Sequence, residues 1–554
     1  MSTPVLVAVA WPYASGSRHL GHLAGAYLPA DVFARHQRLV GNEVLMVSGS
    51  DVHGTPITVR ADDEGVTAQD IVDRYHGEFE RQWDEIGLQW DLYTTTGTEH
   101  HARVTQEMFL TQLEKGHIDK RTSEQFFDPE AERFLPDRYI EGTCPHCGYG
   151  EARGDQCDNC GRTLDATDLI EPRSKISGAT PELRPTEHFY FRYSDFTTKV
   201  DAFLSEKQGW RPHVLNFVKS WIKEEGLLDR AITRDLDWGV ELPVDDLGPG
   251  KRIYVWYDAV IGYLSASQEW AQRQGDDDRW RHWWHNADSR HVYFIGKDNI
   301  PFHCLFWPAQ LMGYDAEIHL PDDVPANQYI TFKGGKASAS RGVGLTIQEG
   351  LDLFQPDGLR YALAASFPEQ ADTDISVEEI ARRINEELVA TWGNLVNRVL
   401  SMVAKNFGEQ PPVDGRSAED EAVLATVDEL LTTANGQFER VELKAALRTA
   451  MDAAQAVNAY LNATEPWKVA KEDLDRAGVL LGTALDAING VRIGFVPFLP
   501  FSSAALDDVL GPVDGWSRTP VPTGTTIAKP TPLFTKVDVD ALLADAVSAD
   551  DGED

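Results

Sequence analysis

The sequence predicts an α/β protein in which a Rossmann-like parallel sheet, interrupted by an insertion, is followed by an all-helical domain. Residues 4–11 (PVLVAVAW) form a continuous apolar run, as expected of a strand buried on both faces. A small-residue turn, a helical pattern and a second apolar run from residue 43 follow, which is the usual opening of a parallel nucleotide-binding sheet. Long helical patterns fill the chain from about residue 378 onward.

Apolar runs like those of the first strands return at 252–264 and 291–299, which indicates that the sheet is split. Pro29 falls inside the first helical pattern and predicts a kink there, because proline lacks a backbone N–H. The segments expected from these patterns are the first half of the Rossmann-like domain at 1–115, an insertion at 116–230, the second half at 231–325, a connector at 326–377, a helical domain at 378–510, and a poorly ordered linker with an acidic tail at 511–554.

The charge of the chain is strongly negative: 51 basic against 88 acidic residues give a formal net charge of −37. A protein that binds nucleic acid is normally basic, so this balance argues against such a partner at low salt. In molar salt the Debye length falls to ~3 Å, and repulsion of a polyanion is then largely screened. We interpret the acidity as an adaptation of a halophilic source that keeps the surface hydrated.

The ends and the cysteines of the chain indicate its compartment. No apolar run reaches the ~20 residues of a membrane span, so no membrane partner is expected. The apolar N-terminal patch has no basic residue before it, which favours a buried strand over a signal peptide. Five cysteines in a chain of 554 residues make no disulfide framework, so we expect a reducing, cytoplasmic location.

Four of the five cysteines form a pattern typical of a metal site, C-x2-C-x9-C-x2-C. In each pair the two intervening residues let the chain turn so that both sulfurs reach one ion, and four thiolates satisfy tetrahedral zinc without an open position. The pattern therefore predicts one structural zinc ion per chain, with free thiols or two disulfides as the alternative and His146 as a weaker competing ligand. The predicted ligands are Cys144, Cys147, Cys157 and Cys160.

Two histidines, His19 and His22, lie between the first predicted strand and the helix that follows it, in PYASGSRHLGH at residues 12–22. A helix N-terminus carries unsatisfied N–H groups and attracts anions. We expect His19 and His22 to face a bound triphosphate, and Gly21 to let an adenine or ribose approach the backbone. The alternative is two surface histidines near a helix start.

The HLGH tetrapeptide resembles the H-I-G-H signature of class I aminoacyl-tRNA synthetases. Five blocks in order along residues 4–500 are similar, more narrowly, to methionyl-tRNA synthetases, and the last of them resembles the archaeal and eukaryotic branch. The blocks are AWPYASGSRHLGH, SGSDVHGTPI, FLPDRYIEGTCPHCG, YVWYDAVIGY and GKDNIPFHCLFWPAQL. The resemblance implies a methionine-tRNA ligase that forms methionyl-adenylate from methionine and Mg-ATP and transfers it to the 3′ end of elongator and initiator methionine tRNA.

The resemblance also implies a methionine pocket. Sulfur–aromatic contacts are favourable, so an aromatic-walled pocket suits a thioether. Tyr263 and His303 are expected to offer a hydrogen to the sulfur, and Asp51 to hold the substrate ammonium. Taken singly, Trp11 and Trp256 are better explained as ordinary core, and only the motif blocks favour the pocket. The implied pocket residues are Trp11, Tyr13, Asp51, Trp256, Ala259, Tyr263, Asn299 and His303.

Two further sites follow from the resemblance. FKGGKASASRG at 332–342 stands where the family carries the K-M-S-K-S loop, which implies catalytic roles for Lys336, Ser338 and Ser340. The second lysine of that motif is Ala339 here, and loss of a cation from a phosphate clamp can cost several kcal/mol of barrier. The alternative for this segment is a flexible polar loop. The helical domain would bind the anticodon through Asn394, Arg398 and Trp467, which alternatively are bundle residues.

Two other interpretations of the whole chain remain open at this stage. Ala339 favours a catalytically impaired tRNA-binding paralogue of a class I synthetase, against the otherwise intact motif residues. A synthetase for another amino acid is the other rival. The leucine, isoleucine and valine enzymes need a larger insertion for editing, and the cysteine enzyme is expected to hold zinc in its pocket. Some members of the family dimerise through an added C-terminal oligonucleotide-binding domain. Nothing after residue 511 resembles that domain, so we expect a monomer.

Overall fold

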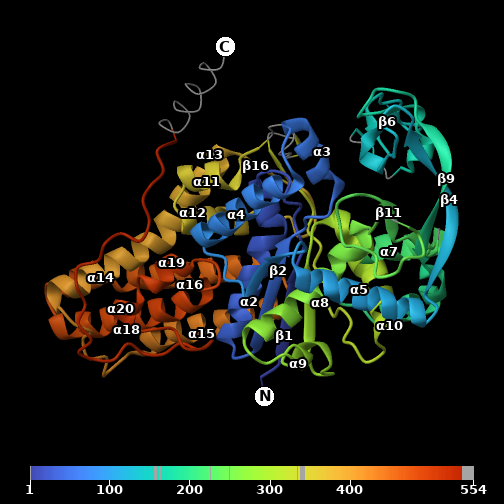
Figure 1. The fold of residues 1–554 in the computed structure, drawn as a ribbon. Coiled ribbons are helices and arrows are strands. Elements are labelled where there is room, and N and C mark those ends of the chain that lie inside the picture. The colour runs from blue at the N-terminus through green and yellow to red at the C-terminus, as the bar shows by residue number, and fades with distance from the viewer. Residues whose placement is uncertain are drawn as a thin grey trace, which may run out of the picture.

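The computed structural model describes residues 2–154, 157, 159–160, 164–224, 226–248, 250–332, 335–336 and 344–539, with the backbone alone for residues 137, 335 and 336. Figure 1 shows a central sheet, a helical bundle (orange to red) on one side of it, and a long two-stranded arm, β4 and β9, on the other. The split Rossmann-like sheet and the helical domain predicted from the sequence are both confirmed.

The central sheet has four parallel strands in the order β13-β1-β2-β3. β1 is buried along its whole length and pairs on both sides, so that Val7 lies opposite Val292 on one neighbour and opposite Met46 on the other. A strand that is covered on both faces needs the unbroken apolar run seen in the sequence. The strands are β1 (Pro4–Val9), β2 (Glu43–Ser50), β3 (Leu92–Thr95) and β13 (Arg290–Phe294).

Helices cover both faces of this sheet. Because side chains alternate along a strand, the odd-numbered residues of β1 join one hydrophobic core and the even-numbered residues another. The first core contains α2 and α4 and continues into the connector and the bundle, whereas the second contains α5, α8 and α10. The bounds are α2 (Leu28–Leu39), α3 (Thr55–Glu64), α4 (Ala68–Ile86), α5 (Glu99–Glu114), α8 (Val255–Arg273), α9 (Arg281–Trp284) and α10 (Trp307–Tyr314).

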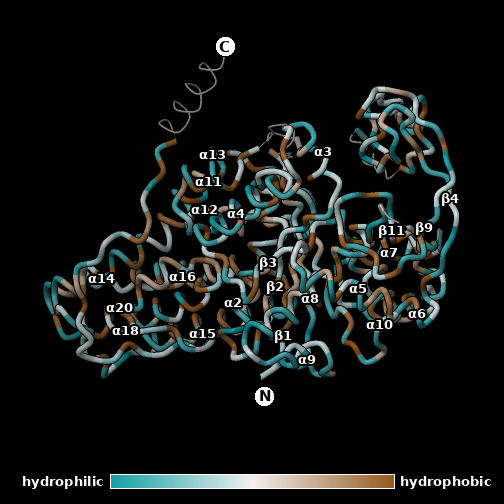
Figure 2. Tube along the Cα trace, viewed as in Figure 1, coloured by the Kyte–Doolittle hydropathy of each residue, from teal (hydrophilic) through white to brown (hydrophobic). Residues whose placement is uncertain are grey.

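The insertion is an arm made of two long antiparallel strands, β4 (Ile118–Asp128) and β9 (Glu182–Phe191). Figure 2 shows β4 as largely hydrophilic, in keeping with its mostly exposed or half-buried residues. The strands between them are β5 (Arg133–Phe134) and the small sheet of β6 (Ile140–Thr143), β7 (Ala152–Arg153) and β8 (Ile170–Ser174); those after them are β10 (Arg230–Ala231), β11 (Thr233–Asp235) and β12 (Lys251–Ile253).

The helices that follow the arm differ from the expected insertion boundary. α6 (Thr197–Ser205) and α7 (Pro212–Glu224) were assigned to the insertion, yet their buried residues Val200 and Val214 belong to the core shared with the even-numbered residues of β1. The arm and the segments that pack on the sheet both contain turn-forming and aromatic residues. Composition alone therefore does not show where the arm ends, whereas packing does.

The kink expected at Pro29 takes the form of a π-helical turn. The turn η1 (Leu23–Tyr27) precedes α2, in which Pro29 occupies the first turn. Proline lacks the N–H that would bond to Gly25 O, and the Nδ2 of Asn327 donates to that oxygen instead at 2.8 Å. A second π-helical turn, η6 (Phe302–Phe306), precedes Pro308 in the same way. Such turns are often found at functional sites.

The connector and the bundle follow the second half of the sheet. The connector holds β14 (Ile330–Phe332), β15 (Gly335–Lys336), β16 (Thr373–Ile375), α11 (Ile347–Leu353) and α12 (Pro356–Ala364). The bundle holds α13 (Val377–Arg382), η8 (Arg383–Gly393), α14 (Asn394–Asn406), α15 (Ala418–Glu439), α16 (Leu443–Thr464), α17 (Pro466–Val469), α18 (Leu474–Phe495), α19 (Pro500–Ala504) and α20 (Asp507–Leu510). No helix in the described part of the chain combines the length and apolar character needed to cross a membrane.

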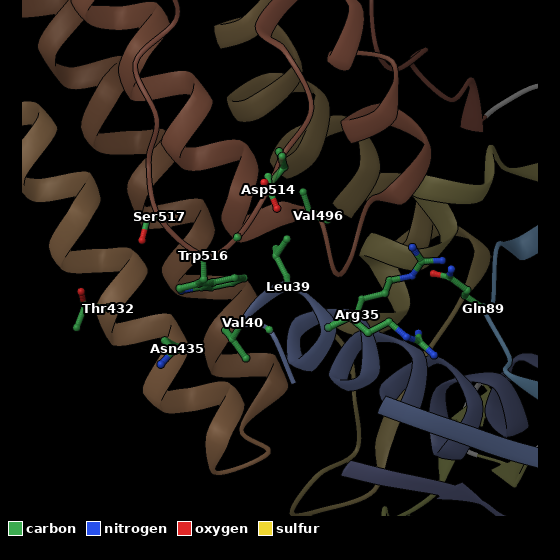
Figure 3. Close-up of a pocket in the computed structure, with 14 residues that line it drawn as sticks. Arg35, Leu39, Val40, Gln89, Thr432, Asn435, Val496, Asp514, Trp516 and Ser517 are labelled. Atoms are coloured by element: carbon green, nitrogen blue, oxygen red, sulfur yellow. The ribbon is translucent and has the colours of Figure 1, made fainter. Parts of the chain in front are cut away.

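The segment from 511 to 539 departs from the expectation of a poorly ordered linker. It has almost no regular structure, but it runs back along the bundle and bonds to it: Trp516 Nε1 donates to Leu431 O at 3.0 Å, and Asn385 exchanges two hydrogen bonds with the backbone of Val537. Figure 3 shows Trp516 between α15 and the end of α2, where it lines a cavity of about 860 Å³. Proline and glycine prevent helix and strand here, yet the backbone still finds partners.

A fully buried ion pair joins the sheet domain, the connector and the bundle. Arg360 of α12 donates to Asp31 of α2 at 2.6 Å, and both side chains are completely buried. The same guanidinium donates to Phe498 O at 2.8 Å, next to α19, and to Ile86 O at 3.1 Å, at the end of α4. Burial opposes the charge of Asp31, but Arg360 and Arg35 hold the pKa of its carboxyl below the usual value.

Replacement of Arg360 is expected to destabilise the whole chain. Arg360→Ala removes the fully buried partner of Asp31 and the donor to several buried carbonyl oxygens, leaving Asp31 with Arg35 and Gln89; breaking a buried pair in this way typically costs about 3–5 kcal/mol. The matched control is Arg382→Ala, because Arg382 also pairs with carboxylates but is 41% exposed, and such pairs contribute about 1 kcal/mol or less. Denaturant unfolding followed by fluorescence compares the two. Equal small losses would contradict a structural role for the buried pair.

Candidate active site

A cavity of about 1180 Å³ lies at the carboxyl ends of β1 and β2, where ligands bind in open parallel sheets. It is lined by every predicted pocket residue and by the three predicted residues of the HLGH motif. These residues come from segments far apart in the sequence, and the structure brings them together: Trp11, Tyr13, His19, Gly21, His22, Asp51, Trp256, Ala259, Tyr263, Asn299 and His303.

Backbone pairing beyond the ends of the strands fixes Asp51 beside Tyr13. The two residues form a parallel bridge, in which Asp51 N donates to Pro12 O at 2.8 Å and Ala14 N donates to Asp51 O at 3.0 Å. Asp51 is 3% exposed. Its side chain is therefore held at the wall of the cavity by main-chain bonds that do not depend on a ligand.

Glycines make room for the two aromatic side chains at this end of β1. A Cβ atom on Gly49 would lie 2.2 Å from the Trp11 ring, and one on Gly262 would lie 2.7 Å from it. A Cβ atom on Gly54 would lie 2.2 Å from the Tyr13 ring. The sequence interpretation missed these glycines, although each stands inside one of the motif blocks. They are needed so that the aromatic rings can lie against the backbone.

The histidine motif forms the start of the first helix. His19 is the N-cap residue of α1 (Leu20–His22), its backbone N–H donates to Nδ1 of His22 at 3.2 Å, and the two rings lie 3.7 Å apart. A Cβ atom on Gly21 would approach the His19 ring to 2.9 Å. Gly21 thus leaves space for the His19 ring in this arrangement, in addition to the role toward adenine or ribose expected from the sequence.

The segment after the predicted phosphate loop is bonded directly to this motif. Leu20 N donates to Leu345 O and Ile347 N donates to Arg18 O, each at 2.9 Å. On the other side of the loop, β14 and β15 form a short antiparallel pair. Ser338, Ala339 and Ser340 lie outside the described residues, and of Lys336 only the backbone is described. The segment that follows the loop is therefore tied to the start of the histidine motif.

The predicted hydrogen-bond donors to the methionine sulfur are bonded to each other. His303 Nδ1 lies 2.9 Å from the Asn299 carbonyl oxygen and must donate to it. Burial lowers the pKa of His303 to about 4, so the ring is neutral and its Nε2 accepts from the Tyr263 hydroxyl at 2.6 Å. The hydrogens that Tyr263 and His303 were expected to offer to the methionine sulfur are thus used in these two hydrogen bonds. The faces of the two rings are still available for contact with the sulfur. Asn299 contributes its backbone carbonyl to this arrangement.

Two pairs of aromatic rings line the cavity. The Trp11 and Tyr263 rings meet edge to face at 6.2 Å, and Trp256 meets Phe302 edge to face at 5.4 Å. Ala259 lies one helical turn after Trp256 on α8 and packs in the same small cluster as Tyr13 and Trp256. The small side chain leaves the space between these rings open.

Asp51 is an unusual carboxylate because of what surrounds it. Burial and then the nearby charge of Asp258 raise its pKa to about 8, whereas His53 acts in the opposite direction. Asp258 and His53 were not among the residues predicted from the sequence. His53 belongs to the same block as Asp51, but only the fold reveals that Asp258 on α8 reaches it.

The four predicted zinc ligands converge. Their sulfur atoms all lie within 4.8 Å of one another, and His146 is not part of the group. Gly148 takes a φ of +73° directly after the first pair and allows the chain to turn back, so that Gly148 N donates to Cys144 O at 3.0 Å. Gly161, after the second pair, lies outside the described residues.

The chemistry of these thiols fits a soft divalent ion. A hydrogen bond from Asn159 lowers the pKa of Cys147 to about 6, whereas burial raises the pKa of Cys157 to about 11. A bound cation is what would keep a buried thiol such as Cys157 as a thiolate. Four sulfurs at tetrahedral spacing match zinc.

The three predicted anticodon residues share one surface of the bundle. Arg398 lies one turn after Asn394 on α14, and its guanidinium stacks over the Trp467 ring at 5.7 Å. Arg398 also donates to Asn458 Oδ1 at 3.1 Å, while Trp467 is 36% exposed. The arrangement presents an aromatic face beside hydrogen-bonding groups, which is how unstacked RNA bases are commonly bound.

Comparison with known proteins agrees with this geometry. The family model described as class I tRNA synthetases (M) matches residues 5–400, and the model described as the anticodon binding domain of methionyl tRNA ligase matches residues 411–545. The methionine–tRNA ligase of Roseiflexus castenholzii is 46% identical over 99% of both chains, and that of Dehalococcoides mccartyi is 49% identical over 97% of this chain and 98% of its own.

A solved structure gives the same result. The Mycobacterium tuberculosis methionyl-tRNA synthetase in complex with methionyl-adenylate superposes with a TM-score of 0.78 at 26% identity, over 96% of this chain and 100% of the other. These relatives are bacterial, so they do not support the archaeal branch suggested by the GKDN-I-P-F-H block. The family models and the full-length relatives together show that the chain belongs to the methionyl-tRNA synthetases, the class I aminoacyl-tRNA synthetases that act as methionine–tRNA ligases.

Proposed function

We propose that the large cavity is where the chain activates methionine with ATP before transferring it to methionine tRNA. The observation that carries this proposal is the convergence of residues from distant motif blocks on one cavity. The tuberculosis enzyme, which has the same fold, is described with methionyl-adenylate bound. The reaction is in-line attack of the methionine carboxylate on the α-phosphorus, so the protein acts by positioning and by charge.

Each part of the cavity has a role in this proposal. Asp51 pairs with the substrate ammonium, since it is the buried carboxylate at the wall. His19 and His22 contact the phosphates from the helix start, and Lys336 approaches them from the loop. Magnesium accompanies ATP as part of the substrate. The tRNA terminal hydroxyl then attacks the acyl carbon, and no protein nucleophile is required.

Selection for methionine rests on shape and on aromatic faces more than on a hydrogen bond to sulfur. Because the Tyr263 hydroxyl donates to His303, neither group offers a free hydrogen to the thioether in this arrangement. Trp256 and the Tyr263 ring instead supply polarizable surfaces, and each sulfur–aromatic contact contributes ~0.3–1.5 kcal/mol. A branched leucine side chain fits a slot between flat rings less well than an unbranched chain.

Amino-acid-dependent exchange of pyrophosphate into ATP tests the function. Exchange should be faster with methionine than with leucine by at least ~100-fold in kcat/KM, which a shaped pocket with buried polar walls can achieve. Norleucine, with a methylene in place of sulfur, is the matched control and should fall between the two. Absence of exchange with every amino acid, combined with tRNA binding, would instead support the impaired paralogue suggested by Ala339.

The cysteine group is proposed as a structural zinc site that stabilises the far end of the arm. All four ligands are protein thiolates, so the ion has no open position for catalysis. We expect one zinc per purified chain by elemental analysis. Cys157→Ser should release it and loosen the small sheet, while Cys304→Ser, the matched control in the sheet core, should leave the zinc content unchanged. Metal-free wild-type protein would reject the proposal.

The bundle surface formed by Asn394, Arg398 and Trp467 is proposed as the anticodon site. The anticodon-domain match covers Trp467 but begins after Asn394 and Arg398, and the stacking of Arg398 on Trp467 links the two parts. We further propose that the chain acts as a monomer in the cytoplasm and serves both initiator and elongator tRNA.

The acidity of the chain is proposed as an adaptation to high salt. A net charge of −37 makes the folded chain repel itself at low ionic strength, and salt screens that repulsion. The melting temperature should therefore rise between ~0.1 and ~2 M KCl. A flat or falling melting temperature over this range would remove the salt explanation for the acidity.

A further inference from the structure

Three buried ionisable side chains near Asp51 do not line the cavity. Asp258 is completely buried, His101 is 1% exposed, and the His53 side chain is 9% exposed. They come from three different elements: His53 follows β2, His101 lies on α5, and Asp258 lies on α8. None of them is needed by the roles assigned above, yet burying three such groups together is unfavourable unless they compensate one another.

Hydrogen bonds link the members of this cluster to one another. Asp258 Oδ2 lies 2.6 Å from His53 Nδ1, and Asp258 Oδ1 bonds to His101 Nε2. The Ser265 hydroxyl donates to Gly262 O at 3.1 Å, which leaves its oxygen to accept from His101 Nδ1 at 2.7 Å. Both ring nitrogens of His101 thus lie within hydrogen-bond distance of oxygen atoms. Asp258 is held between His101 and His53.

The charges in the cluster agree with the geometry. Burial alone would raise the pKa of Asp258, but His101 and His53 bring it far below its usual range, so Asp258 is ionised. Burial opposes a charged His53, but Asp258 and then Asp51 raise the pKa of its ring above the ordinary value. Two carboxylates, Asp51 and Asp258, therefore share one buried region, with His53 bonded to both: its ring to Asp258 and its backbone N–H to Asp51 Oδ1 at 3.3 Å.

This arrangement matters because a protonated Asp51 cannot pair with an ammonium ion. The charge of Asp258 disfavours ionisation of Asp51, and the charge of His53 favours it. The phenol of Tyr263 also faces Asp51 but stays neutral, since burial raises its pKa well above the usual range. His53 is thus the cation within the cluster that offsets the repulsion between the two carboxylates.

We propose that His53, held by Asp258 and His101, is a positioning residue that lets Asp51 ionise when the ammonium of methionine binds. This inference rests on the proposed role of Asp51 in binding the ammonium. His53 does not touch the substrate in this account; it acts through Asp51. Methionine binding is then coupled to the charge of a histidine that does not line the cavity.

The consequence for the wild-type chain is a proton released on binding. Because burial and Asp258 raise the pKa of Asp51 to about 8, the empty pocket holds a protonated carboxyl at pH 7. Pairing with the ammonium requires the carboxylate, so methionine should bind more tightly as the pH rises from 6 to 8. Calorimetry at pH 7 in two buffers of different ionisation enthalpy should count close to one released proton per methionine.

The test of His53 is calorimetric binding of methionine to His53→Asn across pH 6 to 8.5. The amide nitrogen of asparagine can still donate to Asp258, but it carries no charge. Loss of the cation should weaken methionine binding about 10-fold at pH 7 and move the midpoint of the pH dependence up by about one unit. ATP binding should be unchanged. His282→Asn is the matched control, since His282 is 42% exposed and pairs with Glu43 away from the cavity.

Two further measurements separate the possible failures. The methionine analogue with a hydroxyl in place of the amino group should bind wild type and His53→Asn alike, because it presents no ammonium. Asp51→Asn should weaken methionine binding but not binding of the hydroxy analogue; equal methionine affinity in Asp51→Asn and wild type would overturn the ammonium assignment itself.

If Asp51→Asn weakens methionine binding while His53→Asn keeps the wild-type affinity and pH midpoint, the role of His53 alone is overturned. The proton count needs only wild-type protein, so it holds even if the variants fold poorly. Zero released protons at pH 7 would also overturn the inference.

Discussion

Pairing of β1 with β13 on one side and β2 on the other is the constraint on which the site depends. This pairing brings the segments after residues 9, 50 and 294 to one edge of the sheet, although they are far apart in the chain. The bridge between Tyr13 and Asp51 extends the same pairing past the end of the strands. The strand pairing therefore fixes the backbone from which several of the cavity's side chains project.

The π-helical turns η1 and η6 lie where the chain passes from the cavity into helices α2 and α10. Each is followed by a proline in the next helix, and at the first turn the carbonyl oxygen of Gly25, which lines the cavity, accepts from Asn327. Farther from the cavity, Arg360 ties α2 to the connector and to the end of the bundle. Helix α2, which follows the histidine motif, is therefore also the helix that Arg360 connects to the end of the bundle.

Much of this could be predicted from the sequence. The apolar run of β1, the histidine motif and the cysteine pairs are local patterns, and local patterns determine local geometry. The cavity residues were predicted through the family resemblance, since Trp11 or Trp256 alone is indistinguishable from core. Their placement around one cavity is consistent with that resemblance.

The remainder depends on contacts between distant segments. Nothing local in the sequence indicates that Asp258 reaches His53 and His101, or that Tyr263 and His303 bond to each other. The packing of residues 511–539 was missed for a similar reason, because a segment rich in proline and glycine can be ordered by partners elsewhere in the chain. The sequence also did not indicate that a side chain at Gly21 would collide with the ring of His19.

The central claim is that one cavity at the end of β1 and β2 holds methionyl-adenylate. A crystal structure of the chain with a non-hydrolysable methionyl-adenylate analogue tests it most directly. We expect the ammonium within hydrogen-bond distance of the Asp51 carboxylate, the thioether against the faces of Trp256 and Tyr263, and the phosphate beside His19 and His22. An analogue bound outside this cavity, or bound there with its ammonium facing away from Asp51, would contradict the account.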